Sequence, residues 1–151
     1  MDRYLFLLPG VLAGVLAIGM SATAMTAPRC GDFLAALAQK PAGAEFVGCE
    51  ATKNAQLDVL RATYRVAGAR AATVEQHFVK TSGMARLRFL CCGWEPMRHN
   101  RIPPHQGIYR SREGTTYEVS MVSGETLIRR RAAWASIPHF VVTVERALDP
   151  H

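Results

Sequence analysis

The stretch 58-DVLRATYRVAGARAATVEQHFVKTSG-83 decides the fold, because its hydrophobic period changes once along its length. From Asp58 to Ala67 apolar and polar residues alternate, which predicts a β-strand with one buried side and one side in water. After Gly68 the apolar residues recur at helical spacing from Ala69 to Thr81, and Gly83 stands where a C-cap glycine belongs. This order predicts a helix that packs on an antiparallel sheet.

The segments on either side extend this pattern. Residues 93–107 are irregular and rich in proline, which indicates one long loop. The other expected elements are helices over 32–39 and 124–135, the latter capped by Ser123, strands over 45–51, 86–92 and 139–146, and a hairpin over 107–122 that turns at Glu113-Gly114. Because strands mostly follow strands, we expect an α+β fold of two layers: a mainly antiparallel sheet of about six strands with two or three helices on one face.

Residues 1–27 are a separate part of the chain. Arg3 precedes an uncharged apolar run from Tyr4 to Met20, and small residues then lead to an Ala-x-Ala cleavage pattern that ends at Ala24. This order is typical of a secretory signal peptide. The run also has the minimum length of a membrane span, so retention as an anchor is the alternative. We expect a periplasmic protein with one domain over residues 28–151, either free or anchored in the inner membrane through residues 4–20.

The chain is basic, with a formal net charge of +6 at pH 7. In an exported protein, we do not expect this charge to serve nucleic acid. It suits an acidic protein partner or an anionic envelope surface, although a charge of this size also serves to keep a small domain in solution. We therefore expect a protein partner, and membrane contact only through residues 4–20 if that segment is retained.

Four cysteines in an exported domain indicate disulfide bonds. They are Cys30, Cys49, Cys91 and Cys92, which leaves three pairings open. A bridge between the adjacent Cys91 and Cys92 would close a strained ring, so this pairing ranks last. In a strand these two side chains point to opposite faces. One of them would then bridge to Cys30 and the other to Cys49, which would staple the first helix and the first strand to the middle of the sheet.

The sequence carries no strong catalytic motif. It has no G-x-S-x-G elbow, no H-E-x-x-H pair, no P-loop and no dinucleotide-binding glycine pattern. His99 and His105 share the long loop, but nothing in the sequence supplies a third metal ligand. We therefore expect no catalytic residue, no metal site and no cofactor. A small enzyme built around these two histidines is the weakest alternative.

Two basic clusters and one tryptophan are the candidate binding residues. The long loop is stiffened by Pro103 and Pro104, and a stiff loop that presents arginine loses little conformational entropy when it docks on a protein. The second cluster fits the solvated face of a helix equally well, but its arginines would also suit carboxylates or phosphates. The predicted partner-binding residues are Arg98, His99, Arg101, His105, Arg129, Arg130, Arg131 and Trp94.

Trp94 stands in a segment of unusual composition, Leu90-Cys91-Cys92-Gly93-Trp94-Glu95-Pro96. The structural interpretation is a disulfide anchor with the indole ring lying over the core. The functional alternative is a ligand pocket under Trp94 in which Glu95 is the polar group.

The motif Cys91-Cys92-Gly93-Trp94-Glu95, together with Cys30-Gly31-Asp32-Phe33, Cys49 and Val74-Glu75, resembles a small exported bacterial family of unknown function. The resemblance covers nearly all of residues 30–146 and implies a non-catalytic protein. In size, compartment, disulfide content and missing catalytic machinery the chain is also similar to periplasmic immunity proteins of type VI secretion effectors. This likeness implies an inhibitor of a toxic hydrolase, such as a phospholipase, that acts in the periplasm. The alternative is an envelope module that binds a small ligand or an anionic lipid.

Overall fold

The structure is a computed structural model in which residues 28–148 are described. The expected signal peptide or anchor, residues 1–27, lies outside the described residues. No helix within residues 28–148 is long and apolar enough to cross a membrane. The elements are, in chain order, α1 (Phe33–Ala36), β1 (Ala44–Asn54), β2 (Leu57–Ala67), α2 (Gly68–Ser82), β3 (Leu87–Leu90), β4 (Gly93–Pro96), β5 (Gly107–Arg110), β6 (Thr116–Val122), the 3-10 helix η1 (Arg131–Ser136) and β7 (His139–Ala147).

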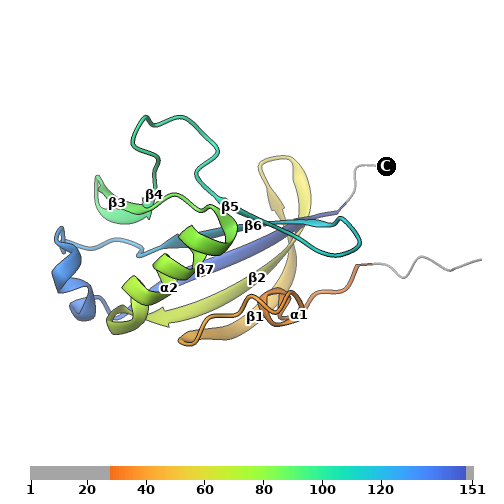
Figure 1. Cartoon of the computed structure of the whole chain (residues 1–151), viewed down its shortest axis with the longest axis horizontal. Helices are drawn as coiled ribbons and strands as arrows, with labels where there is room; N and C mark the ends of the chain where they lie inside the picture. Colours follow the sequence, from red (N-terminus) through yellow and green to blue (C-terminus); the bar gives the residue numbers. More distant parts are fainter. Residues whose placement is uncertain (1–27, 149–151) are drawn as a thin grey trace, which may run out of the picture.

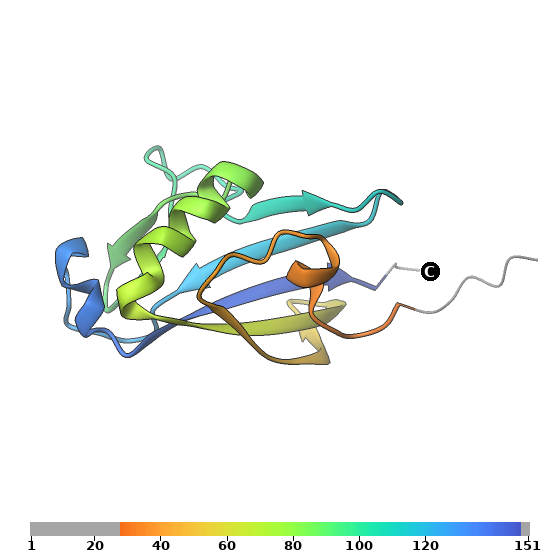
Figure 2. The same ribbon diagram turned by 60° about the horizontal axis from the view of Figure 1, so that its bottom comes forward.

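Five of the strands form one sheet in the order β1-β2-β7-β6-β5, and every neighbouring pair is antiparallel. β3 and β4 pair with each other in a separate hairpin. The sheet is twisted, and α2 and α1 lie on the same face of it (Figures 1 and 2). The predicted α+β fold with a mainly antiparallel sheet is confirmed.

The core fills the space between the sheet and α2, as the sequence pattern predicts. From Leu60 to Ala67, buried side chains of β2 alternate with more exposed ones, and α2 buries one stripe. The helix ends at Gly83, whose φ of 72° favours glycine because other residues strain there. The inward side chains of the central elements are Leu60, Ala62, Tyr64 and Val66 of β2, Ala71, Val74 and Phe78 of α2, and Phe140, Val142 and Val144 of β7.

The prediction of a helix over residues 124–135 is wrong. The chain there is irregular until η1, and Leu127, an apolar residue of the expected helix, is 91% exposed. Backbone groups of this segment, which a helix would have bonded within itself, are instead bonded to the β3–β4 hairpin. Gly93 forms a β-bridge with Glu125, and the Trp94 indole N–H donates to the Ile128 carbonyl at 2.7 Å.

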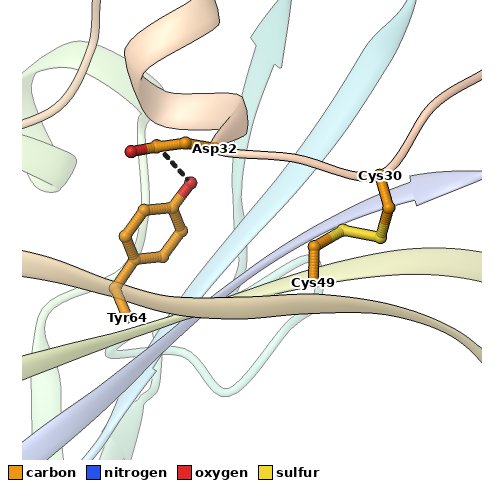
Figure 3. Close-up of a disulfide and its surroundings, with 4 residues drawn as sticks. All are labelled: Cys30, Asp32, Cys49 and Tyr64. Atoms are coloured by element: carbon orange, nitrogen blue, oxygen red, sulfur yellow. Dashed lines mark hydrogen bonds between the residues drawn. A yellow bond between two sulfur atoms is a disulfide. The ribbon is translucent and has the colours of Figure 1, made fainter.

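Of the three disulfide pairings left open by the sequence, the favoured one, which joins Cys91 and Cys92 to Cys30 and Cys49, is wrong. Cys30 is bonded to Cys49, with their Cα atoms 5.5 Å apart (Figure 3). Cys91 and Cys92 are free and exposed. The physical reason is that the strand predicted over 86–92 already ends at Leu90. The two adjacent cysteines form the turn of a hairpin whose second strand, β4, occupies the start of the expected loop. Both of their side chains therefore face solvent.

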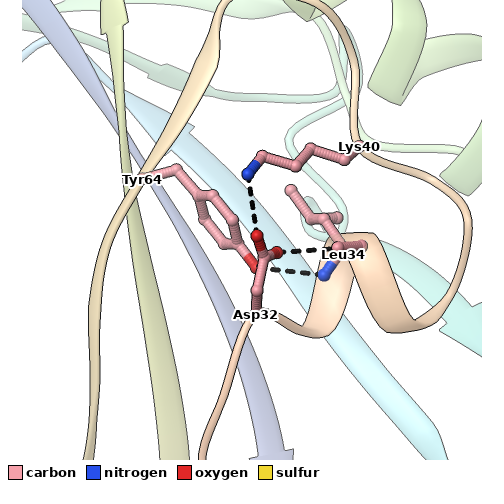
Figure 4. Close-up of polar contacts among 5 residues, drawn as sticks. Asp32, Leu34, Lys40 and Tyr64 are labelled. Atoms are coloured by element: carbon pink, nitrogen blue, oxygen red, sulfur yellow. Dashed lines mark hydrogen bonds and ion pairs between the residues drawn. The ribbon is translucent and has the colours of Figure 1, made fainter.

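A hydrogen-bonded cluster fixes α1 beside the disulfide (Figure 4). Asp32 is the N-cap residue of α1, and its Oδ1 accepts hydrogen bonds from the backbone N–H of Ala35 at 3.0 Å and from the Tyr64 hydroxyl at 2.9 Å. The Tyr64 hydroxyl in turn accepts from the backbone N–H of Leu34 at 3.0 Å. Lys40 Nζ lies 2.7 Å from Asp32 Oδ2. This cluster satisfies backbone groups that a helix terminus leaves free.

Candidate functional site

The β3–β4 hairpin is anchored on α2 through one buried acid. The Glu75 side chain, on a residue that is 3% exposed, accepts a hydrogen bond from the Leu87 backbone N–H at 2.7 Å. Its other carboxylate oxygen is paired with the Arg131 guanidinium, which also donates to the Leu87 carbonyl at 2.8 Å. Arg131, predicted to bind a partner, thus holds α2, β3 and η1 together.

Aromatic rings complete this anchor. Trp94 is 5% exposed, and its ring packs edge-on against Trp134 with the ring centroids 5.0 Å apart. The Arg131 guanidinium lies over the Trp134 ring at 4.3 Å, a favourable cation–π distance. The structure therefore places Trp94 inside the protein, in the position that the structural interpretation predicted for its ring, but without a disulfide beside it.

The loop that joins β4 to β5, residues 97–106, is called the basic loop below; it extends away from the sheet (Figure 1). It is tied back at several points. Arg98 Nε donates to the Pro104 carbonyl at 2.5 Å, and the Ala85 backbone N–H donates to the His105 carbonyl at 2.9 Å. The His105 ring nitrogen Nδ1 accepts from the Arg98 backbone N–H at 3.3 Å. Internal hydrogen bonds thus give the loop a defined shape, as its two prolines predicted.

A groove of about 780 Å³ lies between this loop, the end of α2 and β3. Two predicted residues, Arg98 and His99, line it. They are joined by Arg86 and Arg88, which reasoning from the sequence did not select. The Arg88 guanidinium lies 3.1 Å from His99 Nδ1. We call this feature the basic groove; its lining is Val79, Gly83, Met84, Ala85, Arg86, Arg88, Met97, Arg98, His99 and Asn100.

Within the described part of the chain, the arginines of the basic groove form no ion pairs. Among residues 28–148, the carboxylates that form ion pairs are Asp32, Asp58, Glu75 and Glu145, and none of them pairs with Arg86, Arg88 or Arg98. Three guanidinium groups and one imidazole therefore border the same groove beside apolar side chains. Such a lining suits a ligand that carries carboxylate or phosphate groups, because arginine binds both in a bidentate manner.

The other predicted arginines do not line the groove. Arg101 is exposed on the basic loop, and its backbone N–H donates to the Arg98 carbonyl at 3.0 Å. Arg129 lies over the Phe89 ring at 5.4 Å, and Arg130 is exposed before η1. Arg129, Arg130 and Arg131 thus have three different environments, because the segment that carries them is not the regular helix that was expected.

A second, smaller cavity of about 270 Å³ opens beside the hairpin turn. Cys91, Cys92, Trp94 and Glu95 line one side of it, and residues 122 and 124–125 line the other. The predicted ligand pocket near Trp94 and Glu95 therefore has a physical counterpart, which sits at the tip of the hairpin.

The two histidines of the basic loop are engaged separately. His99 contacts Arg88, and His105 contacts the backbone of Arg98. Within the described part of the chain, no three His, Cys, Asp or Glu side chains are grouped so that they would hold a metal ion.

Comparison with known proteins gives a family match for the first part of the chain. Residues 20–94 match a domain of unknown function, DUF4952. The matched segment includes Cys30, Cys49, α2 and the Cys-Cys-Gly-Trp motif, so the expected resemblance to a family of unknown function is confirmed to that extent. The likeness to immunity proteins stays a prediction. Neither a curated protein nor a solved structure matches the chain.

Proposed function

We propose that the protein is an exported, non-catalytic binding protein that holds an acidic segment of another protein in its basic groove. We further propose that this partner is a toxic hydrolase acting in the periplasm, and that the protein is its immunity protein or inhibitor. The observation that carries the proposal is the set of three arginines, Arg86, Arg88 and Arg98, which border one groove without an internal ion-pair partner among the described residues.

The groove combines features that favour protein binding. Arginine is enriched at protein interfaces, and its planar fork matches a carboxylate in geometry as well as in charge. The basic loop is already held by the hydrogen bonds of Arg98 to Pro104 and of Ala85 to His105, so docking costs little further ordering entropy. Val79, Met84 and Met97 supply apolar surface beside the charges.

Inhibition of a hydrolase suits such a groove, because blocking a catalytic cleft needs shape and charge complementarity and no chemistry. An acidic catalytic cleft or acidic loop would be attracted over a distance by the net charge of +6, which raises the association rate. The Cys30–Cys49 disulfide is compatible with a location outside the cytoplasm. Both points support the proposal.

The test starts with the full chain, exported by its source bacterium and tagged at the C-terminus. Proteins that bind it from the envelope and secreted fractions are identified, and the affinity of a captured hydrolase is then measured. We expect the double variant Arg86→Glu, Arg88→Glu to lower this affinity by about tenfold or more, mainly through loss of charge complementarity. The double variant Arg98→Glu, Arg101→Glu tests the basic loop in the same way.

The matched control is Arg112→Glu, an exposed arginine in the turn between β5 and β6 and away from the groove. It changes the net charge half as much as each double variant, and we expect at most about a twofold effect, since a distant exposed charge is screened by salt. An affinity that falls equally in the control and in the groove variants would assign the effect to net charge. Full affinity in the Arg86→Glu, Arg88→Glu variant would remove the groove from the proposal, and full affinity in the Arg98→Glu, Arg101→Glu variant would remove the basic loop.

A second candidate function is supported by the smaller cavity at the hairpin. An envelope module that binds a small ligand would use its mostly apolar lining, with Glu95 as the polar group. We rank it second because about 270 Å³ is just below the ordinary size range of ligand pockets. Binding to anionic phospholipid vesicles that falls as salt rises would favour the lipid version of this function.

A further inference from the structure

Two free thiols stand side by side at the tip of the β3–β4 hairpin. The hairpin register pairs Leu90 with Gly93, so Cys91 and Cys92 are the two central residues of the turn. Both are exposed, and neither is in the Cys30–Cys49 disulfide. The chain has four cysteines, so no further cysteine remains as a partner within it.

The turn that carries these thiols is held in place by the segment that follows β6. The Thr126 backbone N–H donates to the Cys92 carbonyl at 2.7 Å, and the Trp94 backbone N–H donates to Ser123 Oγ at 2.8 Å. The approach is close at Gly93, where a Cβ atom would lie 2.6 Å from the Gly124 carbonyl oxygen. These contacts with the segment that follows β6 fix the backbone of the two cysteines, while their side chains stay exposed.

A disulfide between the two residues is disfavoured by the length of the backbone. Consecutive Cα atoms are about 3.8 Å apart across a trans peptide bond, whereas disulfides usually span about 4.4–6.8 Å between Cα atoms. The Cα atoms of Cys30 and Cys49, which do form a disulfide, are 5.5 Å apart and so lie within this range. The hairpin thus presents two thiols that form a disulfide with each other only with difficulty.

We propose that Cys91 and Cys92 form a binding site for a soft monovalent metal ion, Cu(I), with their two sulfur atoms as its protein ligands. Thiolates select soft ions such as Cu(I). Zinc requires four ligands in a structural site, and among residues 28–148 no third His, Cys, Asp or Glu completes such a group here. Cu(I) is satisfied by two thiolates in a linear arrangement, so the available donor set matches this ion.

Binding replaces protons and involves no change of oxidation state. The two thiols and one Cu(I) ion give a copper bis-thiolate and two released protons, so two S–H bonds break and two S–Cu bonds form. Because an ordinary thiol is protonated at neutral pH, copper must compete with protons there, and its affinity should increase as pH rises.

The test uses the full-length protein under anaerobic conditions with Cu(I) supplied as its complex with the chromogenic chelator bicinchoninate. We expect the protein to withdraw one equivalent of copper, with an ultraviolet thiolate-to-copper band. Cys91→Ser and Cys92→Ser should each abolish this withdrawal. At pH values below the thiol pKa values, the release of two protons should raise the affinity by up to about 100-fold per pH unit.

Two further measurements make the result decisive. The double variant His99→Gln, His105→Gln is the control for other metal ligands on the neighbouring loop, and it should bind copper as the unmodified chain does. Alkylation of the native protein followed by mass spectrometry should label two cysteines. A protein with no reactive thiol, with no copper withdrawal, or with undiminished withdrawal in the Cys91→Ser, Cys92→Ser double variant would overturn the proposal.

Discussion

The α1 end of the domain and the β3–β4 hairpin are both additions to the five-stranded sheet, but they are fixed by different interactions. α1 is held by the Cys30–Cys49 disulfide and by the hydrogen bonds of Asp32 and Tyr64 (Figures 3 and 4). The hairpin is held by the Glu75–Arg131 ion pair and by aromatic packing, and its own two cysteines are free. The two elements lie toward opposite ends of the sheet (Figures 1 and 2).

The amount of buried apolar surface explains the difference. α1 has four residues and buries only Phe33 and Leu34, and so short a helix is not stable by itself. A covalent link that removes chain entropy is effective there. The hairpin buries Leu87 and Trp94 in the main core and needs no such link. Among the described residues, its two cysteines form no disulfide and its Arg88 forms no ion pair.

The largest effect on stability should come from the ion pair that anchors the hairpin. Arg131→Ala leaves the Glu75 carboxylate buried with one hydrogen bond, from Leu87, and uncovers the Trp134 ring. We expect a loss of about 3–5 kcal/mol in the free energy of unfolding, toward the lower value because the Arg131 side chain is 39% exposed. Urea unfolding followed by tryptophan fluorescence measures it. Arg130→Ala is the matched control and should change stability by at most about 0.5 kcal/mol; equal losses would contradict the assigned role of Arg131.

The two cysteine pairs should also differ in their effect on stability, and the larger loss should come from the pair beside α1. The double variant Cys30→Ser, Cys49→Ser opens a link between residues 19 apart in sequence and should cost about 2–4 kcal/mol. The double variant Cys91→Ser, Cys92→Ser changes only exposed side chains and should cost at most about 0.5 kcal/mol. Urea unfolding with and without reductant compares them, since reductant should weaken the unmodified chain but leave the first variant unchanged. A larger loss in the second variant would mean that the hairpin cysteines hold the fold.

The elements that the sequence predicted correctly are those with a clear local hydrophobic periodicity. β2 and α2 follow directly from the alternation after Asp58 and the helical spacing after Gly68, and the two-layer fold follows from them. The segment 124–135 has apolar residues at helical spacing as well, yet it is irregular because the hairpin binds its backbone through Gly93 and Trp94. That contact joins parts of the chain about 30 residues apart, and no local pattern reports it.

The residues of the candidate site also divide into those that a local pattern predicts and those that it does not. Arg98 and His99 were selected because a proline-stiffened loop carries them, and both line the basic groove. Arg86 and Arg88 were predicted only as part of a strand over 86–92, and both are exposed on either side of the buried Leu87. Their role in the groove depends on where the basic loop folds back, and that return is set by the bond from Ala85 to His105.

A smaller effect is expected from the hydroxyl that holds α1. Tyr64→Phe removes the acceptor of the buried Leu34 N–H and the donor to Asp32, so we expect a loss of about 1–3 kcal/mol. Tyr109→Phe is the comparison, because the Tyr109 hydroxyl has one partly buried partner, Thr81, and its loss should cost about 1 kcal/mol. Thermal unfolding of both variants would show the order. A Tyr64→Phe variant as stable as the unmodified chain would mean that water replaces the hydroxyl and that the disulfide alone positions α1.

The smallest effect should appear only in acid, at Asp32. Burial of this carboxyl opposes ionisation, but the hydrogen bonds from Lys40, Ala35 and Tyr64 outweigh it and lower the pKa of Asp32 below its ordinary value of 3.8. Because the folded pKa lies below the unfolded one, the stabilisation is fully present above pH 3.8 and is lost as pH falls through the folded pKa. Asp32→Asn keeps a good N-cap but cannot titrate, so its stability should depend less on pH in this window.

Hydrogen exchange at the Leu34 and Ala35 amides gives the local measurement for Asp32. In the unmodified chain we expect the protection of these amides to fall below pH 3.8, after correction for the intrinsic rate, while the protection of the β2 amides holds. The Cys30–Cys49 bond keeps α1 near the sheet when Asp32 is protonated, so the opening should stay confined to α1. Simultaneous loss of protection in α1 and β2 would instead mean that the hydrogen bonds of Asp32 support the whole domain, and the α1 end would then resemble the hairpin in being part of one cooperative unit.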